Sequence, residues 1–141
     1  MKKIFIIFGL ISGAAFYAQE LTDQMKGMLK YDNIDEFSTY VKKEDLNKCF
    51  QIKESSYSLL ALSIKMDSQK FFQKLIDEKA DLNLICDDKT PLMFATKYGN
   101  LALAKKLLER GADKNKKSNK GLTALDYAKK YDKPELVKIL E

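Results

Sequence analysis

The last third of the sequence repeats itself, and this repetition limits the possible folds more than any other feature. Thr90 to Gly99 reads Thr-Pro-Leu-Met-Phe-Ala-Thr-Lys-Tyr-Gly, and a related run returns 33 residues later, from Thr123 to Asp132. Self-similarity at a period of about 20–50 residues is typical of stacked supersecondary units. Because such stacks present an extended binding surface, we expect a binding protein rather than a catalytic pocket.

The copy that starts at Thr90 reads as two helices followed by a turn. Thr90 can cap a first helix, and Pro91 occupies the first helical position, where proline is tolerated. Gly111 can supply the left-handed residue with which a second helix ends. Asp113 and Asn115 favour the turn that follows. The local signals therefore agree on a helix-turn-helix unit.

On these residues the chain resembles ankyrin repeat proteins. The family pattern is Thr-Pro-Leu-His-x-Ala-Ala, then Gly, then Leu-Leu, then Gly-Ala-Asp-x-Asn, and Met93 stands where the family usually has His. The resemblance implies an all-α fold, an ankyrin repeat solenoid of about four helix-turn-helix units joined by hairpin loops. The matching positions are Thr90, Pro91, Leu92, Ala95, Gly99, Leu107, Leu108, Gly111, Ala112, Asp113 and Asn115.

Two fainter copies precede this one. The run from Ser58 to Asn83 aligns at a spacing of 32, and the run from Lys30 to Asn47 is degenerate, as a terminal capping unit should be. At least about three units are needed for stability, so a fragment that starts after Asn83 is predicted not to fold alone. We expect a single domain over residues 19–141, with units at about 24–56, 57–88, 89–121 and 122–141.

The N-terminus has the pattern of a secretory signal peptide. Met1-Lys2-Lys3 is positive, and apolar and small residues follow as far as Ala18, where polar sequence begins. We expect residues 1–18 to be removed; a cut after Ala15 and an uncleaved anchor are the alternatives. The apolar run is short for a membrane span. We therefore expect an exported protein, periplasmic or secreted, with no stable membrane insertion after cleavage.

The charge pattern bears on the kind of partner. The net charge is +5 and falls to +3 without residues 1–18, since Lys2 and Lys3 are lost. This mild charge and the expected export argue against nucleic acid. Residues 114–141 hold eight basic and four acidic side chains, with the densest run at Lys114–Lys120. That run suits an acidic partner or, as the alternative function, an anionic non-protein ligand such as an acidic glycan or a lipid head group.

The composition offers little for catalysis. The chain has no histidine, which removes the usual general base and the triads built on imidazole. Two cysteines alone cannot complete a zinc site of the usual composition. Asp87-Asp88 lacks the ordered ligand spacing of a calcium loop and reads as a solvated turn. We expect a protein that is not an enzyme, with no catalytic residues, no cofactor and no metal.

The two cysteines leave one question open. Cys49 and Cys86 each follow an Asp-Leu-Asn segment, and two cysteines in an exported chain suggest a disulfide. Equivalent points on stacked helical repeats lie about 10 Å apart, whereas a disulfide needs Cα atoms within about 7 Å. The spacing favours two free thiols, with a bridge as the alternative.

The resemblance also implies where a partner protein binds, namely across the hairpin tips and the first helices of the units. The two positions before the glycine of each first helix are expected to face outward, and the position just before each first helix is expected to be exposed. Tyrosine is a favoured interface anchor, and a neighbouring lysine steers acidic surfaces toward it. For Tyr98 and Tyr131, shielding of the helix junction is an equal alternative. We expect a monomer whose partner-binding residues are Tyr57, Lys65, Met66, Asp87, Lys89, Lys97, Tyr98, Asn119, Lys120, Leu122, Lys130 and Tyr131.

Overall fold

The structure, a computed structural model, describes residues 19–141, and the predicted signal peptide with its cleavage sites lies outside the described residues. None of the helices in this part of the chain is long and apolar enough to cross a membrane. The elements in chain order are β1 (Gln19–Glu20), α1 (Asp23–Tyr31), α2 (Phe37–Tyr40), η1 (Lys43–Asp45), β2 (Phe50–Ile52), β3 (Ser55–Tyr57), α3 (Leu59–Lys65), α4 (Gln69–Asp77), α5 (Pro91–Tyr98), α6 (Leu101–Glu109), α7 (Ala124–Lys130) and α8 (Pro134–Leu140).

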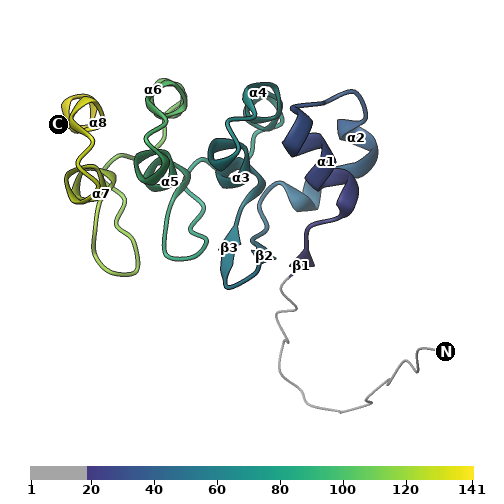
Figure 1. Ribbon diagram of the computed structural model, residues 1–141, viewed down its shortest axis with the longest axis horizontal. Helices are drawn as coiled ribbons and strands as arrows, with labels where there is room; N and C mark the ends of the chain where they lie inside the picture. The colour runs from purple at the N-terminus through teal and green to yellow at the C-terminus, as the bar shows by residue number, and fades with distance from the viewer. Residues whose placement is uncertain (1–18) are drawn as a thin grey trace, which may run out of the picture.

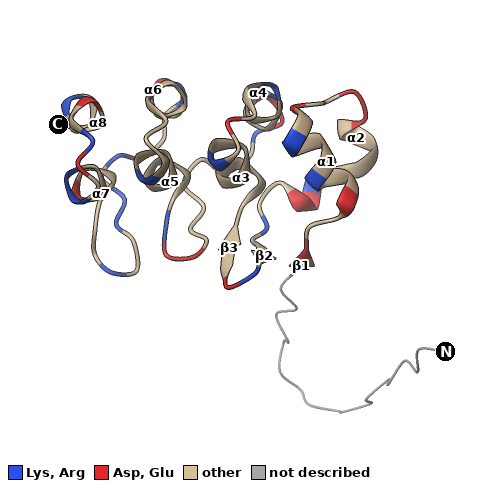
Figure 2. Ribbon diagram, viewed as in Figure 1, with Lys and Arg blue, Asp and Glu red and all other residues tan. Residues whose placement is uncertain are grey.

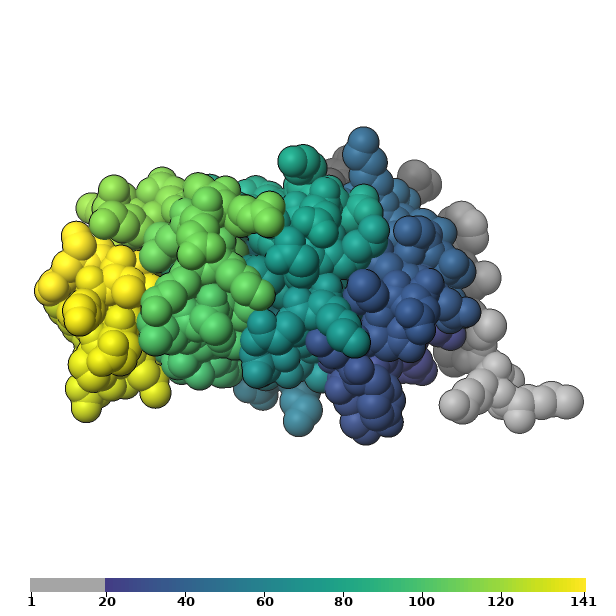
Figure 3. Space-filling view, turned by 90° about the horizontal axis from the view of Figure 1, so that it is seen from above, coloured from purple at the N-terminus to yellow at the C-terminus, as the bar shows by residue number. Residues whose placement is uncertain are grey.

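The helices stand in pairs that stack along the long axis of the molecule (Figure 1). Helices α3, α5 and α7 lie side by side in one row, and α4, α6 and α8 form a second row. The loops between successive pairs project from the side of the first row that faces away from the second. Seen from above, the units follow one another in chain order (Figure 3). The predicted helical repeat stack is confirmed.

The first helices of the third and fourth units begin with the expected caps. The Thr90 hydroxyl oxygen accepts a hydrogen bond from the Met93 N–H (3.3 Å), and the Met93 sulfur accepts one from the Thr90 N–H (3.4 Å). In the fourth unit the Asp126 carboxylate accepts from the Thr123 N–H at 2.8 Å. The sulfur of Met93 thus takes the place that a carboxylate takes one repeat later, because both accept the free N–H of a capping box.

Each first helix ends at a residue with left-handed backbone geometry. Gly99 fills this position after α5 with a φ of 66°, where a glycine carries no steric penalty. Aspartate, which tolerates this region better than most residues, fills it in the other units, at Asp32, Asp67 and Asp132. Asp32 has a second role, because its carboxylate accepts hydrogen bonds from the first N–H groups of α4 (2.9 and 3.0 Å) and so caps a helix of the next unit.

The Asp-x-Asn segments tie neighbouring units together. The Asn83 side-chain oxygen accepts a hydrogen bond from the Asp113 N–H at 2.8 Å, and the Asn47 oxygen accepts one from the Asp81 N–H at the same distance. Within the turn, the Asp113 carboxylate accepts from the Asn115 N–H at 2.9 Å. The motif therefore shapes its own turn and also bonds to the loop of an adjacent repeat.

The apolar faces of the helices meet in one continuous core. Leu92 and Ala95 of α5 are fully buried between the neighbouring first helices, as their spacing of one helical turn predicts. Leu103 and Leu107 of α6 are fully buried between the two rows. Burial of each leucine stabilises the fold by roughly 1.5–3 kcal/mol.

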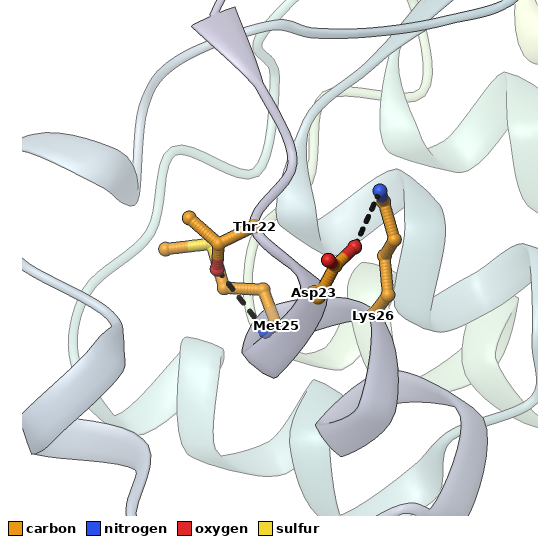
Figure 4. A network of polar contacts seen from close by, with 4 residues as sticks. All are labelled: Thr22, Asp23, Met25 and Lys26. Carbon is orange, nitrogen blue, oxygen red and sulfur yellow. Dashed lines mark hydrogen bonds and ion pairs between the residues drawn. The ribbon is translucent and has the colours of Figure 1, made fainter. Parts of the chain in front are cut away.

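The N-terminal unit is less regular than the others. Thr22 caps α1 by accepting a hydrogen bond from the Met25 N–H (3.2 Å), and Lys26 pairs with Asp23 (3.0 Å) on the exposed side of that helix (Figure 4). Helix α2, however, has only four residues. A three-stranded sheet follows, in which β1 pairs parallel with β2, and β2 pairs antiparallel with β3. No strand was expected here, because runs of two or three residues carry no readable alternation.

The preference for two free thiols was wrong, since Cys49 and Cys86 form a disulfide. Their Cα atoms lie 5.7 Å apart, inside the limit for a bridge. The expectation used the distance between helix axes, but these residues lie in loops that touch. The Asp87 N–H donates a hydrogen bond to the Ser56 hydroxyl (3.1 Å), which brings the hairpin at residues 84–90 against β3.

Candidate partner-binding surface

The C-terminal ends of α3, α5 and α7 place a similar pair of residues on three successive units. Each end presents a lysine followed by a large apolar or aromatic residue. Because these helices lie side by side, the pairs form a line across the stack, and basic residues recur along it (Figure 2). We call this line the Lys–Tyr row; its members are Lys65, Met66, Lys97, Tyr98, Lys130 and Tyr131.

The row is open to solvent, to different extents in different units. Lys65 and Lys130 are exposed, and Met66 keeps 43% of its surface accessible. Lys97, Tyr98 and Tyr131 are half-buried. Tyr98 stacks on Phe94 with ring centroids 6.3 Å apart. Both tyrosines are therefore partly covered by the stack and partly accessible to solvent.

Tyr57 does not lie where it was expected. It is only 4% exposed, so the prediction that this position faces solvent was wrong. Its ring packs on Phe94 with centroids 5.1 Å apart. Its hydroxyl lies 3.2 Å from the Lys65 ammonium and 3.5 Å from the Tyr98 hydroxyl. Tyr57 is buried because its ring packs against Phe94. From this position its hydroxyl contacts the side chains of Lys65 and Tyr98.

The pKa values of the Tyr57 and Tyr98 hydroxyls shift in opposite directions. Burial, followed by the hydrogen bond with Tyr57, raises the pKa of Tyr98 well above its usual value. Burial acts in the same sense on Tyr57, but hydrogen bonds with Tyr98 and Lys65 and the charge of Lys65 outweigh it, so the pKa of Tyr57 is lowered. The Tyr57 hydroxyl oxygen accepts a hydrogen bond from Lys65, which favours its ionised form relative to that of Tyr98.

Lys89 connects the third and fourth units. Its ammonium lies 6.0 Å from the Phe94 ring centroid and 5.5 Å from that of Tyr127. Tyr127 in turn stacks on Tyr131 with centroids 6.0 Å apart. Burial comes first among the causes that raise the pKa of Tyr127, and the nearby Asp88 carboxylate adds to it. A continuous series of aromatic and lysine contacts thus underlies the row from α3 to α7.

The other predicted residues lie on the hairpins. Asn119 and Lys120 are exposed, whereas Asp87, Lys89 and Leu122 are half-buried. Asp87 and Asp88 form the tip of a tight hairpin with φ values of 47° and 67°, closed by hydrogen bonds between Cys86 and Lys89. Among these hairpin residues, Lys89 reaches the aromatic residues beneath the Lys–Tyr row, and Asp87 lies near enough to Tyr98 for its charge to raise the pKa of that residue.

Three residues that build the surface were missed by the sequence analysis: Phe94, Tyr127 and Asp88. Phe94 and Tyr127 occupy the same repeat position, 33 residues apart, and that coincidence of two aromatics could have identified them. Asp88 accepts hydrogen bonds from the Lys120 N–H (3.2 Å) and the Tyr127 hydroxyl (3.4 Å), and so joins two hairpins to α7. Its role depends on a contact across 39 residues that no local pattern reveals.

Several open hollows lie on the surface, and two of them are large. One, of about 440 Å³, borders the row beside Lys65 and Tyr98 and extends to the start of α6. The larger, of about 530 Å³, lies between α2 and the end of α4, where the short α2 leaves space. Residues 19–141 contain no cluster of three or more side chains suited to hold a metal ion.

The comparisons with known proteins agree with this architecture. The family model for ankyrin repeats matches residues 30–118 and 59–141, with three copies. These matches overlap and together span most of the chain. No curated protein was found to match the sequence. Ankyrin repeats generally mediate protein–protein interaction and are typically non-enzymatic.

Proposed function

The chain belongs to the ankyrin repeat family, and from this premise we propose that it is a non-enzymatic binding module that acts in the cell envelope or outside the cell. It holds one partner protein through its first helices and hairpin tips. The observation that carries the proposal is the Lys–Tyr row, in which one lysine and one large apolar residue recur on three stacked helices. Partly exposed aromatics with adjacent cations are typical of interface anchors.

Two observations support export. Residues 1–18 have the composition of a signal peptide, and Cys49 is bridged to Cys86. Structural disulfides persist in oxidising compartments and are rare in the cytosol. A binding module with a bridged N-terminal unit therefore suits the envelope or the exterior, where no reducing system protects thiols.

The proposal is tested by capturing the partner. Residues 19–141 are immobilised and exposed to envelope extract of the source cells, beside a variant in which Lys97, Tyr98, Lys130 and Tyr131 are changed to alanine. A matched control carries Lys70→Ala, Lys105→Ala and Lys138→Ala on the second row of helices, where all three lysines are exposed. Circular dichroism confirms that each variant folds.

We expect one protein, identified by mass spectrometry, to be retained by the parent and by the control and lost from the row variant. No retained protein, or equal retention by all forms, would contradict the proposal. Binding that instead disappears when Lys114, Lys116, Lys117 and Lys120 are neutralised would favour the alternative, an anionic non-protein ligand at the basic hairpin.

A further inference from the structure

We infer that the partner presents an extended acidic segment to the Lys–Tyr row, with carboxylates about three residues apart. The inference rests on the proposed function and specifies its chemistry. It takes Lys65, Lys97 and Lys130 as the three contact points, one on each of the helices α3, α5 and α7. The observations behind it are the free charge of these lysines, their placement by aromatic rings and the regular distance between repeats.

The charges of the row are not neutralised inside the molecule. In residues 19–141 the ion pairs are Lys26–Asp23, Lys48–Asp45 and Lys74–Glu78, and all of them lie outside the row. The Asp67 carboxylate, which follows the row in the second unit, accepts instead from the side-chain amides of Gln69 (2.8 Å) and Asn100 (3.0 Å). The lysines of the row are therefore available to carboxylates of another molecule.

Aromatic rings hold two of these lysines in place before any partner arrives. The Lys65 ammonium lies 4.5 Å from the Tyr57 ring centroid and donates to its hydroxyl. The Lys97 ammonium lies 5.6 Å from the Tyr98 centroid. A lysine that is already restrained loses less side-chain freedom on binding, so its contact with a carboxylate contributes more to affinity.

The distance between repeats determines the spacing of the acidic groups. Packed helices lie about 8–10 Å apart, and equivalent residues on α3, α5 and α7 repeat at this distance. An extended segment in the polyproline II conformation has three residues per turn and advances about 3.1 Å per residue, so every third side chain lies on the same face, about 9 Å further along. Carboxylates at positions i, i+3 and i+6 of an extended segment thus match the three lysines, whereas adjacent carboxylates do not.

The residues between the carboxylates meet Met66, Tyr98 and Tyr131, which alternate with the lysines. The hollow of about 440 Å³ beside Tyr98 has a mostly polar lining and can receive a small polar side chain. Acidic groups border the row at Asp87 and Asp88 on the hairpin and at the exposed Asp67 and Asp132, which directly follow the row in their units. Because these would repel an acidic segment, the segment contacts the lysines from the side that faces away from these carboxylates.

The test uses two fluorescein-labelled peptides of equal composition. One, Glu-Ser-Leu-Glu-Ser-Leu-Glu, spaces its glutamates by three, and the other, Ser-Leu-Glu-Glu-Glu-Ser-Leu, places them together. Fluorescence anisotropy with residues 19–141 gives the Kd of each. We expect the spaced peptide to bind at least about fivefold more tightly, since only it reaches three lysines. Added salt should weaken this binding.

Lysine variants locate the site. Lys65→Gln, Lys97→Gln and Lys130→Gln together should remove the advantage of the spaced peptide, and so should Lys97→Gln with Lys130→Gln, which leaves the Tyr57 contact intact. Lys70→Gln, Lys105→Gln and Lys138→Gln should leave it unchanged. Equal or undetectable binding of both peptides, or an advantage that survives the row variants, would overturn the inference.

The two proposals fail separately. If the partner protein is captured by the parent and lost from the row variant while the peptides bind alike, the row binds a protein by other chemistry and the acidic segment is wrong. If no partner depends on the row, the proposed function fails regardless of the peptide results.

Discussion

The two ends of the described chain reach a stable stack by different means. From Thr90 onward, capping residues, a left-handed helix end and regular apolar faces reproduce one pattern twice. The segment before Tyr57 has a four-residue helix, a short 3-10 turn, three short strands and one half of a disulfide. The C-terminal end uses repetition, whereas the N-terminal end uses specific cross-links.

This difference suggests that the two regions have different roles, one in stability and the other in presenting the Lys–Tyr row. An end unit has a neighbour on one side only, so it buries less apolar surface than an internal unit and needs another source of stability. The disulfide and the sheet supply it at the N-terminal end. Four of the six members of the Lys–Tyr row, by contrast, lie on the units that follow the regular pattern, where similar backbones place side chains at a constant interval.

The largest expected effect is the loss of folding when the two ends are separated. A fragment of residues 84–141 keeps both regular units but loses α3, against which α5 packs. We expect no cooperative thermal transition by circular dichroism. A cooperative transition in this fragment would show that regular repeats suffice and that the N-terminal part is dispensable.

Removing the disulfide should have the next largest effect. The bridge closes a loop of 37 residues, which corresponds to about 4 kcal/mol in the chain-entropy model. We expect Cys49→Ser with Cys86→Ser to lower the free energy of unfolding by this order in urea denaturation. Hydrogen exchange should rise at β2 and α1 while α7 stays protected. An unchanged midpoint on reduction of the parent protein would contradict the role given to the bridge.

A smaller effect is expected at the junction between the two regions. Tyr57→Phe removes a buried hydroxyl that bonds to Lys65 and lies near Tyr98, and should lower the free energy of unfolding by about 1–2 kcal/mol. The matched control is Tyr131→Phe, whose half-exposed hydroxyl makes no hydrogen bond within residues 19–141; its effect should stay within about 0.5 kcal/mol. Equal losses would argue against the Tyr57 cluster.

The smallest effect concerns pH at the C-terminal end. The backbone and hydroxyl of Thr123 donate to Asp126 and lower the pKa of that carboxyl. The pKa of Asp126 in the folded protein lies below its unfolded value of about 4. The stability that the ionised carboxylate contributes is therefore fully present above the unfolded pKa, and it disappears as the pH falls through the folded pKa. Asp126→Asn should therefore make the free energy of unfolding depend less on pH in a denaturation series between neutral and acidic pH. A parallel pH dependence in parent and variant would refute the assignment.

The features that the sequence predicted well depend on residues that lie close together in the chain. Thr90, Pro91 and Gly99 act within their own helix, through a cap hydrogen bond, a fixed φ and a left-handed end, so their types and spacing identify their roles in advance. The family and the helical repeat stack are confirmed for the same reason, because the pattern recurs. The outward position of Met66 could likewise be inferred from its repeat position.

What the sequence did not predict depends on contacts between distant segments. The disulfide joins loops of neighbouring units, and the distance between helix axes gave the wrong estimate for it. Tyr57 is buried because Phe94, in the next unit, packs against it. The strands β2 and β3 are too short to show alternation, and β1, which pairs with β2, lies some thirty residues away in the chain. The binding role of the Lys–Tyr row remains a prediction.

The most direct test of that role is site-specific photocrosslinking in the source cells. A benzophenone amino acid replaces Tyr98, on the row, or Lys105, which is exposed on α6 away from the row. We predict that ultraviolet light produces one crosslinked protein from position 98 and none from position 105. A crosslink from position 105 alone, or none from either, would contradict the account that the Lys–Tyr row is the surface through which this protein binds its partner.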